Sequence, residues 1–492
     1  MGSGGHVLQE TRRMAERMLQ FVTHPQVLPE KRDAAERRQD FGEIYRGFAR
    51  SRAEEQASRC SQCGIPFCSV HCPLGNNIPD WLKLTAEDRL EEAYEMSSAT
   101  NTFPEICGRI CPQDRLCEGN CVINKGFESV TIGAVERFIT ENAFEQGWVK
   151  PALPDRDLGR SVGIVGSGPA GLACAERLRA QGYEVHVYER QDRVGGLLTY
   201  GIPSFKLEKH VVARRHALLE EQGIVFHLST PVGSGEGETS LEDLRARHDA
   251  VFLATGVYRS RDVKVPGAGL EGVVDAIDFL TASNRRGYDE DPGEDAALHA
   301  KGRRVVVIGG GDTAMDCVRT SIRQGAERVT CVYRRDRANM PGSRQEVYNA
   351  EEEGAHFEWL GSPEAFLGDG SVSGVRVLKM RLGAPDASGR RSIEGTGQHD
   401  VIEGDLVIKA LGFDPEDLPG QFNAPELAVT RWGTLTVPPG GFATSLPGVF
   451  AGGDIVRGAS LVVWAIKDGR DAADAIHHHL TETMTGALEA AE

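Results

Sequence analysis

The chain has 492 residues, of which 40% are hydrophobic and 26% charged, a composition typical of a globular protein with two to four domains. Its longest apolar runs are far shorter than the roughly 20 residues that a helix needs to cross a bilayer, so we expect no membrane span. The formal net charge of −17 argues against nonspecific binding to nucleic acid, which requires clustered Lys and Arg.

The N-terminal sequence has basic residues but no apolar segment of a secretory signal, so a cytoplasmic location is expected. Of the 11 cysteines, eight lie between residues 60 and 121. In a chain without an export signal, such a dense set indicates metal binding or redox chemistry more often than disulfides.

Residues 1–155 are predicted to form a helical domain around two cysteine runs. The first run has the spacing C-x2-C-x4-C-x3-C-P, and the second C-x3-C-P-x4-C-x3-C. Four closely spaced cysteines that end in Cys-Pro are typical of ferredoxin-like [4Fe-4S] ligands, in which the last cysteine of a run serves the other cluster. Zinc ribbons usually have two close pairs separated by a longer loop, so structural zinc and disulfides are the weaker alternatives.

After a linker rich in Pro and charge, a buried strand leads into the sequence VGSGPAG. This G-x-G-x-x-G pattern predicts a turn and a helix N-terminus that bind a pyrophosphate, and the acidic residue that ends the next strand suits a free ribose 2′-OH. A second glycine pair follows, and a Gly-Asp element near the C-terminus is placed to reach a ribityl chain, which favours FAD over NAD. The expected FAD residues are Gly166, Gly168, Pro169, Ala170, Gly171, Glu189, Gly195, Gly196, Leu197, Gly453, Asp454 and Ser460.

A second strand-turn-helix unit, VVVIGGGDTAMDC, has alanine in place of the third glycine. The following strand ends in two arginines, which suit a 2′-phosphate and therefore favour NADPH over NADH. The expected NADPH residues are Gly309, Gly311, Asp312, Thr313, Arg334 and Arg335.

The predicted fold class is α/β: a helical iron-sulfur domain followed by two Rossmann-like, glutathione-reductase-like domains, the NADPH domain inserted in the FAD domain. The predicted boundaries are 1–155 for the helical domain, 156–290 and 415–492 for the two parts of the FAD domain, and 291–414 for the NADPH domain. A flavin exchanges either one or two electrons, so it can link NADPH to one-electron clusters. We expect no side chain to act as an acid or base.

These motifs, together with GGLLTYGIPSFKLEK and YRRDRANMPGSRQE, resemble the small (beta) subunits of NADPH-dependent glutamate synthase over nearly the whole chain. Related N-terminal halves occur in dihydropyrimidine dehydrogenase and in the electron-bifurcating NADPH:ferredoxin transhydrogenase. The resemblance implies FAD, NADPH and two [4Fe-4S] clusters bound in crossed fashion. One cluster would be held by Cys60, Cys63, Cys68 and Cys121, and three corners of the other by Cys72, Cys111 and Cys117.

The fourth ligand of the second cluster stays open between two residues. In the dehydrogenase it is a glutamine after the second run, and the matching position here is Glu136, which could also be a solvated helix residue. Cys107 is the alternative ligand.

The resemblance also implies a partner, the large (alpha) subunit, which contains FMN and makes L-glutamate from L-glutamine and 2-oxoglutarate. We therefore predict an electron-input subunit that oxidises NADPH. The alternatives are a subunit of a bifurcating transhydrogenase or another reductase and, in a different class, a zinc-stapled interaction protein.

Overall fold

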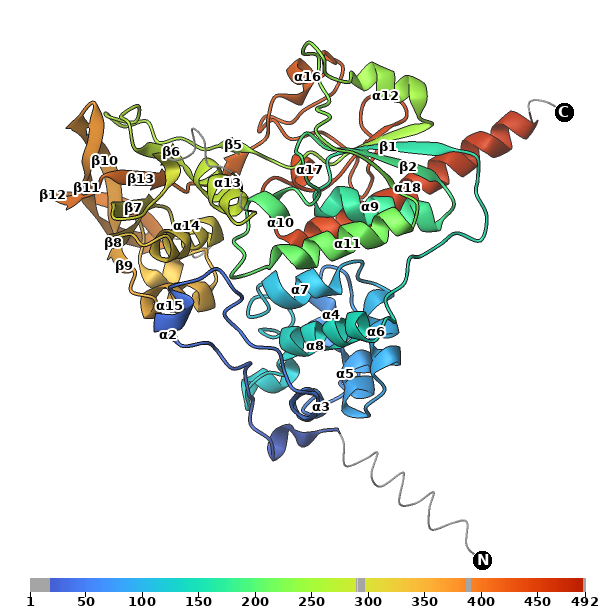
Figure 1. The fold of residues 1–492 in the computed structure, drawn as a ribbon, viewed down its shortest axis with the longest axis horizontal. Coiled ribbons are helices and arrows are strands. Elements are labelled where there is room, and N and C mark those ends of the chain that lie inside the picture. The colour runs from blue at the N-terminus through green and yellow to red at the C-terminus, as the bar shows by residue number, and fades with distance from the viewer. Residues whose placement is uncertain (1–17, 289, 291–296, 386–390, 490–492) are drawn as a thin grey trace, which may run out of the picture.

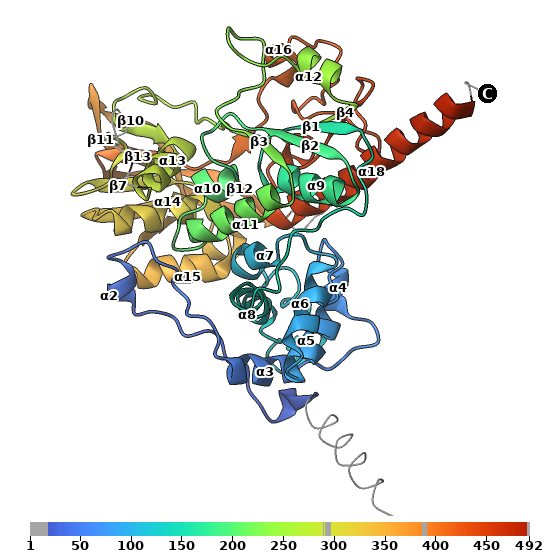
Figure 2. The same cartoon turned by 45° about the vertical axis from the view of Figure 1, so that its right-hand side comes forward.

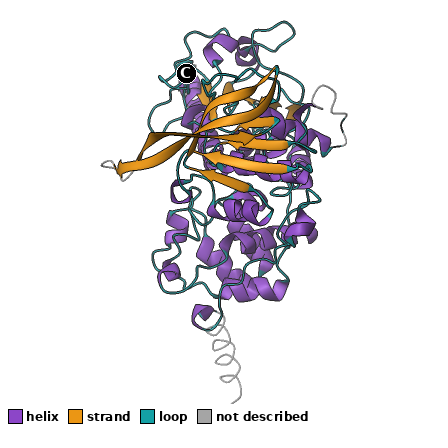
Figure 3. Cartoon of the chain, turned by 90° about the vertical axis from the view of Figure 1, so that its left-hand side faces the viewer, coloured by secondary structure: helices purple, strands orange, loops and turns teal. Residues whose placement is uncertain are grey.

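The computed structural model describes residues 18–288, 290, 297–385 and 391–489. Figure 1 shows three parts: a helical domain below, a first α/β domain at the upper right and a second α/β domain at the left. In Figure 3, the strands gather in the upper part, and the lower part contains only helices and loops. Among the described residues, no helix combines the length and apolarity that a membrane crossing requires.

The helical domain packs around a core that contains the fully buried Trp81. One of its helices buries Ile78, Trp81, Leu82 and Thr85 along one face, the spacing of an amphipathic helix, and has Pro in its first turn, where a missing N–H costs nothing. The helices are η1 (Gln20–Val22), α2 (Ala34–Arg37), α3 (Arg50–Ser58), α4 (Phe67–Val70), α5 (Ile78–Ala86), α6 (Leu90–Ser98), α7 (Pro104–Ile110), η2 (Val122–Lys125) and α8 (Ile132–Glu145).

The first α/β domain contains a five-stranded parallel sheet in the order β15-β4-β1-β2-β3. Its central strands are apolar runs because helices cover both faces of the sheet. The strands are β1 (Ser161–Val165), β2 (Glu184–Tyr188), β3 (Val225–His227), β4 (Ala250–Leu253) and β15 (Val449–Ala451). The helices are α9 (Pro169–Ala180), α10 (Leu197–Tyr200), α11 (Lys209–Glu221), α12 (Leu241–Arg247), α16 (Leu418–Gln421), α17 (Asp454–Arg457) and α18 (Val462–Glu489).

The second α/β domain has a parallel sheet in the order β6-β13-β7-β8-β9, and all of its strands lie between β4 and β15 in the sequence. The predicted insertion of one dinucleotide-binding fold in another is therefore confirmed. The strands are β6 (Val273–Asp275), β7 (Arg304–Ile308), β8 (Arg328–Tyr333), β9 (His356–Trp359) and β13 (Leu406–Lys409). The helices are α13 (Ala276–Arg286), α14 (Asp312–Arg323), η4 (Arg337–Asn339) and α15 (Arg344–Glu352).

The domain boundaries stay a prediction. Residue 291, where the NADPH-binding domain is predicted to begin, lies outside the described residues. Strand β6 precedes that boundary and yet pairs with β13 of the second sheet.

Two smaller sheets accompany the second α/β domain. An antiparallel sheet in the order β10-β11-β12 extends from it, and strands β5 and β14 form a two-stranded link. Strand β12 is an exposed edge strand, so its sequence lacks the apolar alternation by which a strand is recognised. The strands are β5 (Arg259–Ser260), β10 (Gly361–Asp369), β11 (Ser371–Pro385), β12 (Arg391–Glu403) and β14 (Phe413–Asp414).

An N-terminal strap, residues 23–48, runs from the helical domain to helix α15, and both Figure 1 and Figure 2 show α2 beside this helix. Arg37 Nε lies 3.1 Å from Glu353 Oε1, and both side chains are fully buried. The same carboxylate accepts hydrogen bonds from Arg319 and Arg323 of α14. A buried ion cluster thus fixes the strap to the second α/β domain.

Candidate functional site

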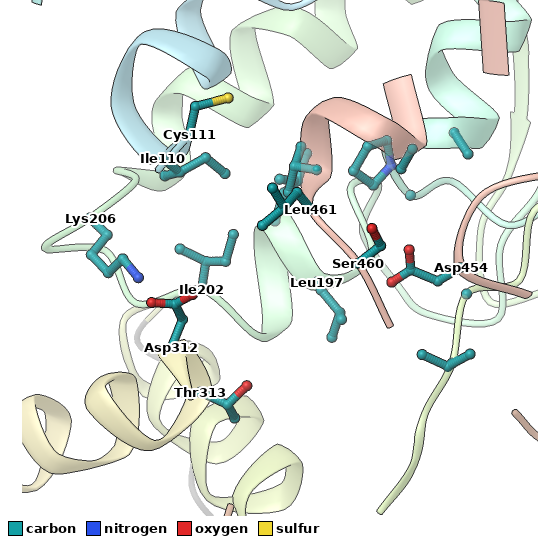
Figure 4. Close-up of a pocket in the computed structure, with 18 of the residues that line it drawn as sticks. Ile110, Cys111, Leu197, Ile202, Lys206, Asp312, Thr313, Asp454, Ser460 and Leu461 are labelled. Atoms are coloured by element: carbon teal, nitrogen blue, oxygen red, sulfur yellow. The ribbon is translucent and has the colours of Figure 1, made fainter. Parts of the chain in front are cut away.

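A cavity of about 870 Å3 lies where the three domains meet. Figure 4 shows Asp454 and Ser460 of the first α/β domain on one side and Asp312 and Thr313 of the second on the other. Ile110 and Cys111 of the helical domain line the same cavity. The two predicted dinucleotide sites therefore open into one space, which also reaches a predicted cluster ligand.

The first glycine turn has the geometry that a phosphate-binding loop requires. Gly166 has φ +101°, and a side chain there would lie 2.6 Å from the Ala254 carbonyl oxygen. A Cβ on Gly171 would lie 2.0 Å from the Gly166 carbonyl oxygen, whereas a Cβ on Gly168 would meet no atom within 4 Å. Gly168 therefore leaves an open space at the N-terminus of α9 that an added Cβ would enter, which suits a bound pyrophosphate.

Eight of the predicted FAD residues line the cavity, and four do not. Glu189 is buried, and its Oε2 accepts hydrogen bonds from the Ser167 N–H (3.0 Å) and hydroxyl (2.5 Å). The lining residues are Gly166, Gly168, Pro169, Ala170, Glu189, Leu197, Asp454 and Ser460. Those that do not line it are Gly171, Gly195, Gly196 and Gly453.

The glycine pair 195–196 holds the α10 loop against the first turn. A Cβ on Gly195 would lie 2.4 Å from Thr199 Oγ1, and one on Gly196 would lie 3.2 Å from the Gly168 Cα. The Gly195 N–H donates to the Ser167 carbonyl at 3.1 Å. The pair thus places Leu197 at the cavity through close backbone packing.

Asp454 begins the four-residue helix α17, and burial raises the pKa of its carboxyl to about 6. Helix α17 ends at Arg457, and the long helix α18 begins at Val462. Leu461, Val462 and Ala465 line the cavity, so α18 presents its first turn to it.

The second glycine turn repeats the first. A Cβ on Gly309 would lie 2.2 Å from the Ala410 carbonyl oxygen, and one on Gly311 would meet no atom within 4 Å. Asp312 and Thr313 line the cavity, whereas the two glycines do not. The turn therefore has the same open approach for a phosphate.

Arg334 and Arg335 follow strand β8 directly, where a 2′-phosphate would be bound. Arg334 is exposed, and neither residue lines the cavity. The Nε of Arg335 is buried and forms no hydrogen bond. The pair therefore offers donors beside the second turn, and one of these is unsatisfied.

Lys206 was missed by the sequence analysis, although it belongs to the motif GGLLTYGIPSFKLEK. Its ammonium lies 2.9 Å from Asp316 and 3.6 Å from Glu346, both in the second α/β domain. These carboxylates raise its pKa despite its burial, so it stays charged. The only sequence signal for it was its place in the same motif as Leu197, which lines the same cavity.

The cysteines surround two further cavities. One is lined by three cysteines of the first run and one of the second, in the crossed arrangement that the resemblance implied: Cys60, Cys63, Cys68 and Cys121. Burial raises the pKa of Cys60 to about 11 and that of Cys68 to about 12. Thiols in this setting become thiolates only when a positively charged metal centre compensates them, which fits a cluster site.

The other cavity is lined by Cys72, Cys111 and Cys117 together with both candidates for the fourth ligand, Cys107 and Glu136. Glu136 is only 7% exposed, so it is not a solvated helix residue. Its Oε1 accepts hydrogen bonds from the side chains of Asn101 (3.1 Å) and Asn76 (3.4 Å), and burial raises its pKa to about 8.

All 11 cysteines are free, so the structure contains none of the disulfides weighed as an alternative. Within the described ranges, no group of three or more His, Cys, Asp or Glu side chains is arranged to hold a metal ion. Ligands of a cluster bind different iron atoms and therefore do not converge on one point. The thiols stand around cavities instead.

The three cavities form a series. Cys111 and Gln113 line both the large cavity and the Glu136 cavity. Ile132 lines both thiol cavities. The cavity at Glu136 (the Glu136 cavity) therefore adjoins the large cavity between the three domains, called the dinucleotide cavity below. The cavity at Cys60 (the Cys60 cavity) adjoins the Glu136 cavity in turn.

Comparison with known proteins agrees with this architecture. The pattern of the family described as "Dihydroprymidine dehydrogenase domain II, 4Fe-4S cluster" matches residues 37–148, and that of "Pyridine nucleotide-disulphide oxidoreductase" matches residues 160–469. The glutamate synthase [NADPH] small chain of Azospirillum brasilense is 62% identical over 468 residues, which cover 94% of this chain and 96% of that protein. The chain belongs to the family of NADPH-dependent glutamate synthase small chains.

Another small chain of this glutamate synthase family, from Escherichia coli K12, is 46% identical over 475 residues, which cover 95% of this chain and 100% of that protein. Among solved structures, FprA of Mycobacterium tuberculosis in complex with NADPH has a TM-score of 0.57 at 22% identity. That alignment covers 67% of this chain and 86% of FprA and shows the shared fold. This member of the small-chain family is therefore an oxidoreductase with an iron-sulfur domain and a pyridine-nucleotide oxidoreductase domain.

Proposed function

We propose that the chain is the electron-input subunit of a glutamate synthase. It would oxidise NADPH by hydride transfer to FAD and pass electrons through two [4Fe-4S] clusters to a large FMN-containing subunit, which makes L-glutamate from L-glutamine and 2-oxoglutarate. The high identity to small chains of this enzyme over almost the whole length supports this assignment.

The observation that carries the proposal is the shared wall between the cavities. Cys111 and Gln113 line both the dinucleotide cavity and the Glu136 cavity, so a flavin in the first would lie next to a cluster in the second. Hydride chemistry and one-electron transfer would then take place in adjoining spaces of one chain.

The residues that would hold each group follow from the geometry. The open Gly168 turn, Glu189 and Asp454 would bind the pyrophosphate, ribose and ribityl parts of FAD. When bound, FAD supplies the two-electron to one-electron conversion. The N-terminus of α18 faces the cavity, so its dipole would favour negative charge there. The chain's role is to orient the two nucleotides and to exclude water from the cavity.

We further propose Glu136 as the fourth ligand of the second cluster. The Cys107 thiol donates a hydrogen bond to Asn101 Oδ1 at 3.8 Å, and it lies one helical turn before Cys111, near enough for each thiol to shift the pKa of the other. Ligands at two corners of a cluster are separated by the cluster itself, so Cys107 is badly placed to act together with Cys111. Glu136 approaches the cavity from the separate helix α8.

Electrons would leave from the Cys60 cavity. Apolar side chains are exposed around it on one segment, with Ile65 at 67%, Val70 at 64% and Phe67 at 46%. Exposed apolar side chains gathered in this way mark interaction surfaces. This surface suits the large subunit that the small-chain family implies.

The test is an anaerobic NADPH titration of the purified chain, combined with iron, sulfide and flavin analysis. We expect flavin, two clusters' worth of iron and NADPH-dependent reduction of an artificial dye, with glutamate formed only after the large subunit is added. Zinc without iron or flavin, or glutamate production by the chain alone, would contradict the proposal.

A further inference from the structure

Arg115 of the helical domain reaches the second glycine turn. It belongs to the loop between Cys111 and Cys117, and its Nη1 donates a hydrogen bond to the Pro341 carbonyl at 2.8 Å. Its Nη2 lies 3.3 Å from Asp312 Oδ2. One guanidinium thus joins the cluster loop to helix α14 and to the loop before α15.

Asp312 is the first residue of α14 and lines the large cavity directly after the open Gly311 turn. Its Oδ1 accepts a hydrogen bond from the Ser343 N–H at 2.8 Å, which fixes the carboxylate at the mouth of the turn. A nucleotide pyrophosphate bound at this turn would lie next to a negative side chain. Two neighbouring negative charges repel each other strongly near a protein surface.

Arg115 is the cation that offsets this charge. Among the ion pairs of the described residues, Asp312 takes part in one, with Arg115. Lys206 lies on the same side of the cavity in Figure 4, but its ammonium pairs with Asp316 and Glu346. Lys206 also attracts Asp312, but less than it attracts Asp316 and Glu346.

We propose, on the basis of the NADPH site assigned above, that Arg115 is a positioning residue for NADPH. By pairing with Asp312 and holding the Pro341 carbonyl, it neutralises the carboxylate beside the α14 turn and lets the pyrophosphate bind. The iron-sulfur domain would then take part in nucleotide binding. The side chains of Arg115 and Asp312 are 42% and 39% exposed. Exposed ion pairs add little to stability, so a purely structural role explains this pair less well.

The experiment measures dissociation constants of NADP+ and 2′-AMP for the FAD- and cluster-loaded protein by calorimetry. In Arg115→Gln we expect NADP+ to bind about tenfold more weakly, whereas 2′-AMP, which has no pyrophosphate, should bind as in the unsubstituted protein. Arg115→Lys should keep most of the affinity because it keeps the charge. Arg376→Gln, which removes an exposed pair with Glu364 far from the cavity, is the matched control.

A second variant separates charge compensation from bracing. Asp312→Asn keeps the oxygen that accepts the Ser343 N–H but removes the charge, so it should restore NADP+ affinity when added to Arg115→Gln. Two results would overturn the inference about Arg115 but not the proposed function. One is unchanged NADP+ affinity in Arg115→Gln, and the other is an equal loss of affinity for NADP+ and 2′-AMP together with a lower melting temperature. Failure of the unsubstituted protein to bind NADP+ would overturn the proposed function as well.

Discussion

Glu105 and Arg215 form a buried, two-bond ion pair between the helical domain and the first α/β domain. Arg215 Nε donates to Glu105 Oε1 at 2.7 Å and Nη2 donates to Oε2 at 3.0 Å, and the side chains are 4% and 0% exposed. Glu105 lies on α7, the helix that ends just before Cys111. The pair therefore holds the helix that leads into Cys111, a proposed cluster ligand, against the first α/β domain.

Removing one partner of this pair should destabilise the protein strongly, because the remaining charge stays buried. We expect Arg215→Met to lower the free energy of unfolding by about 3–5 kcal/mol, measured by urea denaturation followed by circular dichroism. Adding Glu105→Leu to Arg215→Met should recover most of the lost free energy of unfolding. Arg52→Ala, which breaks an exposed pair with Glu55, is the control and should change stability little. A mild effect of Arg215→Met would contradict the prediction.

Loss of Glu136 should remove one cluster. Glu136→Ala is expected to lower the iron and sulfide content by about half and to remove one electron paramagnetic resonance signal from the reduced protein. Glu136→Gln should retain the cluster, because an amide oxygen can replace the carboxylate, and Cys107→Ser should retain it as well. If Cys107→Ser loses the iron and Glu136→Ala keeps it, Cys107 is the ligand.

Glu176 should make the protein less stable as the pH rises. Burial raises its pKa from 4.5 to about 7, and its Oε2 is buried without a hydrogen bond. The folded state therefore binds this proton more tightly than the unfolded state. The resulting stability is complete below the unfolded pKa and is lost as the pH rises through about 7.

Glu176→Gln should remove this dependence. Between about pH 5 and pH 8, the melting temperature of the unsubstituted protein should fall more than that of the variant. Because 22% of the Glu176 side chain is exposed, we expect Glu176→Gln to raise the free energy of unfolding at high pH by only about 1–2 kcal/mol. Glu426→Gln, an exposed position, should follow the unsubstituted protein. Parallel curves for Glu176→Gln would contradict the prediction.

The two arginines after β8 should determine the choice of nucleotide. In Arg334→Ala/Arg335→Ala, we expect the KM for NADPH in dye reduction to rise about 10- to 100-fold, since charge-assisted bonds to the 2′-phosphate are lost. The KM for NADH should change little. Equal changes in KM for NADPH and NADH would show that the arginine pair does not recognise the 2′-phosphate.

Polar substitution near the Cys60 cavity should weaken the complex with the large subunit. For Ile65→Ser/Val70→Ser, we expect about tenfold weaker association, measured by analytical ultracentrifugation, and unchanged NADPH-dependent dye reduction. Neither residue lines the thiol cavity, so the cluster should stay intact. Leu153→Ser, at an equally exposed apolar position in the linker, should leave association unchanged.

The fold was largely predictable because its motifs are local. Strand, glycine turn and helix follow each other within about 20 residues, and steric demands at Gly166 and Gly171 leave little alternative. The crossed grouping of the cysteines was expected from their ferredoxin-like spacing and, residue by residue, from the family resemblance, and the structure brings the side chains together in that way.

Contacts between distant segments were not predictable. Lys206 pairs with Asp316, 110 positions away, and no sequence period signals such a contact. Arg115 looked like an ordinary loop residue.

The strap between the helical domain and α15 has a consequence for biosynthesis. Arg37 bonds to Glu352, 315 positions later. At about 5–20 residues per second, a ribosome needs roughly 15–60 s to synthesise the chain between them. All eight clustered cysteines emerge during this interval, before the partner of the strap exists. These thiols, seven of them proposed cluster ligands, are thus synthesised while the fold that covers them is still being made.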